Sequence, residues 1–128
     1  MKTEQTTAKE IRNRRTKRKL RRTLFVTFTT VTILFVSFMA FASLEEWWTV
    51  GVKGETSGYP WGPINDNPWY YNTPKLYSTV MLSEFIILII GLALTTYFIV
   101  KPNKERAFYS LLVIWVLVII ILANGFVQ

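Results

Sequence analysis

The stretch from Thr23 to Leu44, TLFVTFTTVTILFVSFMAFASL, carries no charged residue and decides the fold class. The hydrocarbon core of a bilayer is about 30 Å thick, so a helix that rises about 1.5 Å per residue crosses it in roughly 20 residues. Within lipid an α-helix satisfies its backbone hydrogen bonds internally, whereas a single strand does not. We therefore predict that this stretch is a transmembrane helix.

Two further apolar runs follow. The run Tyr77–Val100 contains a single charged residue, Glu84, and residues 107–127 contain none. The last run is rich in β-branched residues, but its unbroken length favours a helix over a strand. The sequence thus predicts an all-α integral membrane protein with three transmembrane helices. We divide the chain into a basic arm (1–22), a first span (23–44), a loop (45–76), a second span (77–100), a turn (101–106), and a third span with a short C-terminus (107–128).

The composition excludes several kinds of chemistry. The chain contains no cysteine and no histidine. Disulfides, Cys/His zinc sites, thiol nucleophiles and histidine acid–base catalysis are therefore absent. The sequence also lacks a phosphate-binding P-loop, a dinucleotide-binding glycine motif and a nucleophile elbow. We expect no autonomous enzyme activity and no cofactor or metal bound by this chain alone, although structural lipids are expected.

The distribution of charge predicts the orientation. Residues 1–22 carry ten Lys/Arg against two Glu, or +8, and the turn 101–106 carries three against one, or +2. The loop 45–76 carries two Lys against four acidic residues, or −2. The positive-inside rule then places the N-terminus and the turn in the cytoplasm, and the loop and the C-terminus outside. We expect a prokaryotic plasma membrane. The basic residues assigned to topology and to anionic lipid headgroups are Arg14, Arg15, Lys17, Arg18, Lys19, Arg21, Arg22, Lys101, Lys104 and Arg106.

A secretory signal peptide is the competing interpretation of the N-terminal third. The basic arm, the apolar run and the small-residue pattern Ala40-Phe41-Ala42 would allow cleavage before Ser43. The apolar run is longer than the hydrophobic region of a typical signal peptide, which favours a retained span.

The basic arm has two alternative uses besides topology. Residues 9–22 lack Gly and Pro, so a helix continuing into the first span is expected. The same charges suit an acidic protein partner. Nucleic acid is disfavoured, because the arm has no aromatic residue that would stack on bases.

Hydroxyl residues form a stripe on the first span. Thr23, Thr27, Thr30 and Ser37 fall on one side of an ideal helix, and Phe25, Phe28 and Phe35 on the other. Small hydroxyl residues allow close approach of a partner helix, whereas Phe suits lipid. The stripe is therefore a candidate interface, and the alternative is that each hydroxyl bonds to its own helix.

The loop 45–76 is rich in aromatic residues, proline and glycine. This density of Gly and Pro predicts a turn-rich segment that lies close to the membrane surface. Trp47, Trp48 and Tyr77 fit an aromatic belt at the ends of the spans. The central aromatic residues lie between prolines, where rigid rings lose little conformational freedom on docking. We therefore expect partner contacts at Tyr59, Trp61, Trp69 and Tyr70.

Glu84 is the one ionisable residue within an apolar run. A charge at the centre of a bilayer costs about 2.5–3.5 kcal/mol even on the mildest scales, so such a residue needs a partner or a function. We expect a structural partner on a neighbouring helix or on another subunit. The alternative is a site on a proton or cation path.

These features favour a small, non-catalytic accessory subunit of a larger integral-membrane complex. Redox and energy-transducing enzymes, such as respiratory oxidases and membrane metal-dependent monooxygenases, are the expected class because they carry small additional subunits. The partners would be other integral-membrane subunits and anionic lipids. Two alternatives remain open: a homo-oligomeric channel or transporter lined by Glu84, and a membrane tether that uses the basic arm.

Overall fold

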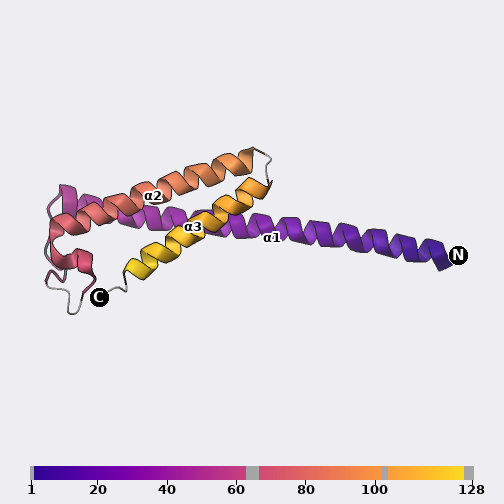
Figure 1. The fold of residues 1–128 in the computed structure, drawn as a ribbon, viewed down its shortest axis with the longest axis horizontal. Coiled ribbons are helices and arrows are strands. Elements are labelled where there is room, and N and C mark those ends of the chain that lie inside the picture. The colour runs from indigo at the N-terminus through magenta and orange to yellow at the C-terminus, as the bar shows by residue number, and fades with distance from the viewer. Residues whose placement is uncertain (1, 63–66, 102–103, 126–128) are drawn as a thin grey trace. The chain divides into compact units, whose positions relative to one another are not determined.

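The computed structural model describes the backbone of residues 2–62, 67–101 and 104–125, and their side chains except those of residues 2–9, 11 and 104. The structure is all-helical over these residues, without strands (Figure 1). The elements are helix α1 (Lys2–Glu46), the π-helix η1 (Trp47–Val52), the 3-10 helix η2 (Trp69–Asn72), helix α2 (Pro74–Val100) and helix α3 (Lys104–Asn124).

The predicted all-α class with three span-length apolar helices is confirmed. By length and composition, three helical segments of the described chain are able to cross a membrane. They are Arg12–Val52, which runs through the end of α1 into η1, then Pro74–Val100 and Glu105–Asn124.

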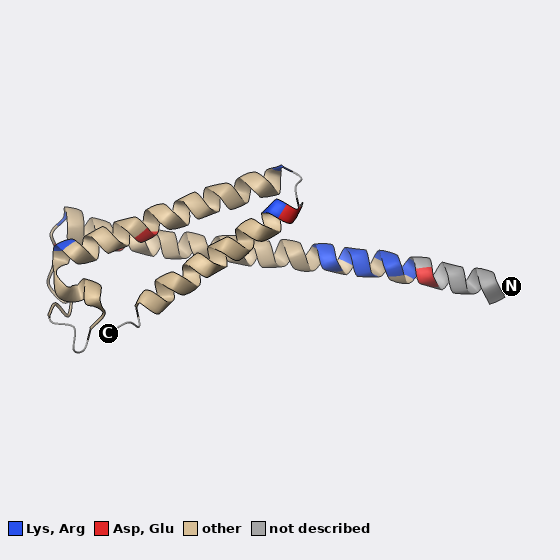
Figure 2. Ribbon diagram, viewed as in Figure 1, with Lys and Arg blue, Asp and Glu red and all other residues tan. Residues whose placement is uncertain are grey.

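The chain forms two compact units, residues 1–32 and residues 33–128. The first unit is the beginning of α1, in which the basic residues and the start of the apolar run lie on one continuous helix. Figure 2 shows its Lys and Arg residues gathered in one stretch of that helix. Glu10 and Arg14 form an exposed ion pair there, one helical turn apart, with 2.7 Å between Oε1 and Nη2.

The second unit has its hydrophobic core where the end of α1, α2 and α3 meet. Val36 and Ala40 of α1 pack with Leu88 of α2 and with Ile114 and Val118 of α3, and all five side chains are buried. The helices α2 and α3 run antiparallel as a hairpin (Figure 1). One face of the bulky third span is therefore buried inside the chain.

A glycine of α2 allows the close approach of α3. A Cβ atom placed on Gly91 would lie 3.3 Å from the side chain of Ile114, which is a tight contact. Membrane helices commonly pack through such small residues, because hydrocarbon gives no hydrophobic drive for helix association. The third span itself lacks small residues at this contact, so α2 supplies the space for its branched side chains.

The second apolar helix begins earlier than the expected span, which starts at Tyr77. Thr73 is the N-cap residue: its backbone is extended, and its Oγ1 accepts a hydrogen bond from the Leu76 amide at 3.2 Å. Pro74 follows at the first helical position, where its missing N–H costs nothing and its fixed φ suits a helix. These local signals start α2 at Pro74 and place Tyr77 within its first turn.

The first apolar helix extends beyond Leu44, the expected end of its span. After Glu46 the chain continues as η1, in which the Lys53 amide donates to the carbonyl of Trp48 at 3.0 Å. The η1 helix packs closely on α2, since a Cβ atom at Gly51 would lie 3.1 Å from the Cβ of Ser78. Trp47 of η1 and the aromatic residues that follow η1 are thereby brought against the beginning of α2.

Candidate functional site

The aromatic residues of the loop 45–76 form one cluster with the beginning of α2. Their rings pack around the buried side chains of Val50, Tyr77 and Met81. We call this cluster the aromatic cap and define it by the residues Trp47, Tyr59, Trp61, Trp69, Tyr70, Tyr71 and Tyr77.

Backbone turns bring the loop back over α2. Gly54 and Gly58 have positive φ angles of 71° and 90°, which favour glycine. The indole N–H of Trp61 donates to the carbonyl of Thr56 at 2.6 Å. Farther along, the side-chain amide of Asn67 donates to the carbonyl of Pro60 at 2.9 Å. The first of these bonds holds the Trp61 ring to the loop backbone, and the second joins Asn67 to Pro60.

Tyr77 lies at the centre of the aromatic cap, with only 4% of its surface exposed. Its ring centroid is 4.8 Å from that of Tyr71, 5.5 Å from Tyr59 and 5.7 Å from Trp61. Tyr77, which the sequence analysis assigns to an aromatic belt, therefore packs inside this cluster.

Glu46, the last residue of α1, binds two tyrosines of the aromatic cap. Its Oε2 atom accepts a hydrogen bond from the hydroxyl of Tyr59 at 2.6 Å and another from the hydroxyl of Tyr77 at 2.9 Å. The bond to Glu46, together with burial and the carboxylate charge, raises the pKa of Tyr59 to about 12. Burial also raises the pKa of Tyr70. Glu46 thus joins the end of α1 to the loop and to α2.

The sequence analysis did not single out Glu46. Glu45 and Glu46 are adjacent at the end of an apolar run, and no spacing distinguishes the carboxylate that faces the aromatic residues. The only available signal was the number of tyrosines nearby, since a buried phenol needs a hydrogen-bond acceptor.

Trp69 lies at the edge of the aromatic cap and reaches the third helix. Its indole N–H donates to Oδ1 of Asn124 at 2.9 Å. Its ring meets that of Tyr70 edge-on, with centroids 5.8 Å apart. The four loop residues expected to contact a partner are thus placed in one cluster: Tyr59, Trp61 and Tyr70 are partly buried within the chain, and Trp69 is the more exposed.

An open groove lies beside the aromatic cap. It has a volume of about 470 Å³ and is lined by Phe41, Leu44, Glu45, Trp47 and Trp48. Phe41 and Trp48 are exposed, at 62% and 50%. The groove is therefore an apolar surface with one carboxylate on its rim.

Glu84 of α2 faces Ser43 of α1. The hydroxyl of Ser43 donates a long hydrogen bond of 3.5 Å to Oε2 of Glu84, and Glu84 is partly buried. A hydroxyl on a neighbouring helix is the kind of partner expected for a structural carboxylate. Among the described residues, no group of three His, Cys, Asp or Glu is arranged to hold a metal ion.

The hydroxyl stripe of the first span is exposed at all four positions. Thr23 and Thr30 donate hydrogen bonds to carbonyls of their own helix, those of Lys19 at 3.1 Å and Val26 at 2.9 Å. At Thr23 and Thr30 the hydroxyl therefore bonds to the backbone of its own helix, as in the alternative interpretation. On the opposite side, Phe35 does not simply face lipid: its ring stacks on Trp115 of α3, with centroids 5.9 Å apart.

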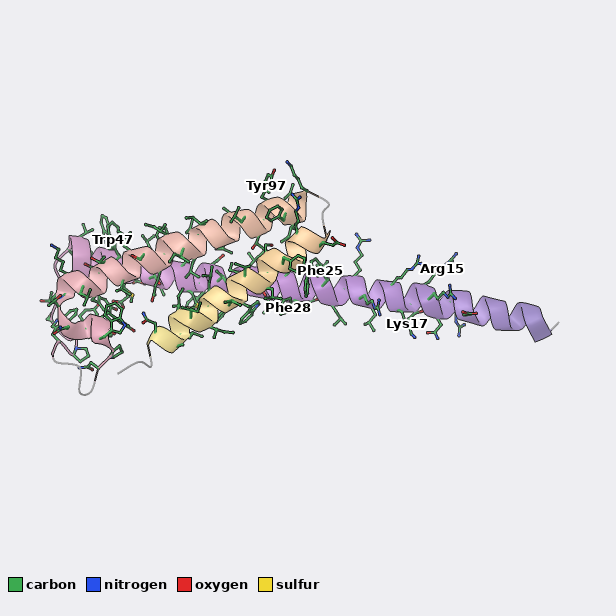
Figure 3. All side chains as sticks on the ribbon, in the orientation of Figure 1. Arg15, Lys17, Phe25, Phe28, Trp47 and Tyr97 are labelled. Carbon is green, nitrogen blue, oxygen red and sulfur yellow. The ribbon has the colours of Figure 1, made fainter. Side chains whose placement is uncertain are left out.

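The basic residues between Arg12 and Arg22 have exposed side chains, and Arg15 and Lys17 project from α1 in Figure 3. At the end of α2, the Lys101 ammonium lies 4.6 Å from the centre of the Tyr97 ring and bonds to its hydroxyl. The side chain of Lys104 lies outside the described residues. The exposed residues of this group are Arg14, Arg15, Lys17, Arg18, Lys19, Arg21, Arg22, Lys101 and Arg106.

Comparison with protein-family models, with curated proteins and with solved structures finds no significant match for this chain. The class of protein therefore follows from the fold itself. The chain is an all-helical integral membrane protein with three span-length apolar helices.

Proposed function

We propose that this protein is a small, non-catalytic accessory subunit of a larger integral-membrane complex. The observation that carries the proposal is the internal hydrogen bonding of the aromatic cap. Glu46 accepts from two tyrosine hydroxyls, and the indoles of Trp61 and Trp69 both donate within the chain. The polar groups therefore hold the rings in place rather than facing a substrate.

A rigid surface of this kind suits protein docking. The groove beside the aromatic cap presents the exposed rings of Phe41 and Trp48, and an aromatic side chain loses little conformational entropy when a partner covers it. Among the described residues, five apolar side chains make up the buried core cluster shared by the three helices. A larger complex would cover more of the apolar surface that this thin core leaves exposed.

In the proposed orientation the basic arm is cytoplasmic and the aromatic cap lies on the outer side. The charges of +8, −2 and +2 along the connecting segments support it. The exposed arginines and lysines of α1 then lie at the cytoplasmic headgroups, where each contributes about 1 kcal/mol of attraction to anionic lipid.

Within the same proposal, the complex is a redox or energy-transducing enzyme whose cofactors are held by other subunits. One support is that this chain lacks histidine and cysteine, so other subunits would supply the cofactor ligands. The other is that complexes of this class commonly contain small additional subunits. The aromatic cap would then cover part of the complex on its outer side.

Site-specific photo-crosslinking in the native membrane tests the docking surface. A benzophenone amino acid at Trp48, in the groove, should crosslink to one integral-membrane protein, which purification in mild detergent then recovers in a fixed ratio with this chain. The matched control is the same label at Leu94, which is 51% exposed on α2 and away from the groove. A chain that gives only lipid adducts at Trp48 and purifies as a monomer would contradict the proposal.

Labelling of single cysteines tests the orientation, because the natural chain has no cysteine. A membrane-impermeant maleimide added to sealed cells should label a cysteine at the exposed Ser57 and should label one at Thr16 only after permeabilisation. Equal labelling of both positions from the same side would rule out the proposed orientation.

A further inference from the structure

Glu45 is the one charged residue among those that line the groove beside the aromatic cap. It is exposed, and among the residues that the structure describes its carboxylate accepts no hydrogen bond and forms no ion pair. Of the two lysines in the loop, Lys53 pairs with Glu55 at 3.8 Å, and Lys75 forms no ion pair with Glu45. The neighbouring Glu46, by contrast, accepts hydrogen bonds from two tyrosines. Glu46 is thus satisfied within the chain, whereas Glu45 is not.

A partner that covers the groove changes the surroundings of Glu45. Water solvates the exposed carboxylate, and a covering protein surface removes that water. A buried charge without a compensating group is strongly unfavourable. Because none of the described residues supplies a cation to Glu45, the counter-charge has to come from the partner.

The two indoles beside Glu45 favour the same kind of group. The rings of Trp47 and Trp48 meet at an angle of 61°, with centroids 6.3 Å apart, and both residues line the groove. The face of an indole is electron-rich and attracts a cation. A guanidinium group stacks on such a face and also binds a carboxylate through two parallel N–H bonds, whereas a lysine ammonium lacks this planar shape.

We propose that the partner subunit inserts an arginine into this groove, with its guanidinium group against the indoles of Trp47 and Trp48 and its N–H groups on the carboxylate of Glu45. This inference rests on the proposed docking function and names the chemistry of the partner. Apolar side chains of the partner then pack on Phe41 and Leu44, which line the rest of the groove.

The groove also predicts where the arginine lies in the partner. Phe41 precedes Glu45 by one helical turn within the charge-free run, and Glu45 directly follows Leu44, the last residue of that run. The groove is therefore apolar towards the middle of the span and charged at its end. A partner helix that lies along it carries its arginine at the end of its own apolar run, on the same side of the membrane as the aromatic cap.

The experiment uses the full chain in its native membrane, with a benzophenone amino acid at Phe41. This label replaces an exposed ring of the groove and leaves Trp47, Trp48 and Glu45 unchanged. After irradiation, mass spectrometry identifies the crosslinked peptide of the partner. We expect an apolar segment with an arginine at the end that lies on the side of the aromatic cap.

The dependence on Glu45 is measured as the amount of partner that is recovered with this chain in mild detergent. Glu45→Gln should lower the recovery by about tenfold or more, because the arginine is left buried without its counter-charge. Glutamine has nearly the same shape as glutamate, so the lining of the groove is kept, and circular dichroism checks the fold.

Glu55→Gln is the matched control. Glu55 is an exposed carboxylate that pairs with Lys53 and does not line the groove. Its replacement should leave the recovery unchanged. An equal loss with Glu55→Gln and Glu45→Gln would show that general charge, and not a specific pair, attracts the partner, which would overturn the inference.

A charge exchange completes the test. Glu45→Arg should abolish recovery of the partner, and replacement of the partner's arginine by glutamate should restore it. Unchanged recovery with Glu45→Gln, or a crosslinked segment without an arginine, would overturn the inference and leave the proposed accessory role standing. If neither Phe41 nor Trp48 crosslinks to a protein, the proposed function fails, and this inference fails with it.

Discussion

Trp69 and Asn124 lie 55 positions apart in the chain, yet the indole N–H of Trp69 donates to Oδ1 of Asn124 at 2.9 Å. This bond ties the edge of the aromatic cap to the last residue of α3. It closes the same end of the second unit at which Glu46 joins α1 to the loop and to α2. The hydrogen bonds of Glu46 and the bond between Trp69 and Asn124 thus connect all three helices through the loop.

The contribution of the Trp69–Asn124 bond is measurable by a double-mutant cycle. Asn124→Ala should lower the free energy of unfolding in detergent by about 0.5–1.5 kcal/mol, the usual worth of one hydrogen bond. Trp69→Phe, which keeps an aromatic ring but removes the donor, should lower it similarly. The double variant should lose less than the sum of the two. Strictly additive losses would show that the pair does not interact.

The ionisation of Tyr59 predicts a change in stability at high pH. Its pKa is raised from 10.0 to about 12, so the folded state holds this proton more tightly than the unfolded state. The resulting stability is fully present below about pH 10 and is lost as pH rises towards about 12. An ultraviolet titration of tyrosinate should show a late transition near pH 12 that Glu46→Gln moves to lower pH. Persistence of that transition in Tyr59→Phe would contradict the assignment.

The core of the second unit should be sensitive to loss of volume at Leu88. This side chain is fully buried between the helices, and Leu88→Ala should cost about 2–5 kcal/mol of unfolding free energy. Leu94→Ala on the same helix is the matched control, because Leu94 is half exposed. Thermal unfolding in detergent, followed by circular dichroism, should separate the two variants. If Leu94→Ala lowers the free energy of unfolding as much as Leu88→Ala does, the face of α2 that packs in the core is not the one that carries Leu88.

The contact between Ser43 and Glu84 predicts a mild effect of Glu84→Gln. The amide oxygen still accepts the hydrogen bond from the Ser43 hydroxyl, so helix content and unfolding temperature should change little. Liposomes that contain either chain should be equally impermeable to cations. A cation flux through the natural chain that disappears in Glu84→Gln would instead favour the alternative of an ion path.

Local features of the sequence were sufficient to predict the helices. The charge-free run from Thr23 and the two later runs predicted span-length helices, because bilayer thickness relates directly to the number of apolar residues. At the loop the helices extend beyond the expected spans. The cap at Thr73 with Pro74 starts α2 before Tyr77, and α1 continues into a π-helix for which the sequence carries no recognised signal.

The site was predictable only in part. The aromatic and proline content of the loop indicated a candidate site there. The four residues expected to contact a partner, Tyr59, Trp61, Trp69 and Tyr70, lie in or at the edge of the aromatic cap. Their orientation was not predictable, since a partner surface and an internal cluster need the same residue types. The rings of Tyr59, Trp61 and Tyr70 pack largely within the chain, whereas Trp48, assigned to the lipid interface, lines the open groove.

The helical class and the number of apolar helices follow from the sequence alone, because these depend on the length and polarity of continuous segments. Which carboxylate meets the tyrosines depends on how the three helices and the loop pack. Glu45 and Glu46 are chemically identical neighbours, and the rotation of one residue along α1 directs Glu46 towards the hydroxyls of Tyr59 and Tyr77. Such a choice depends on how distant segments pack, which no local pattern of residues encodes.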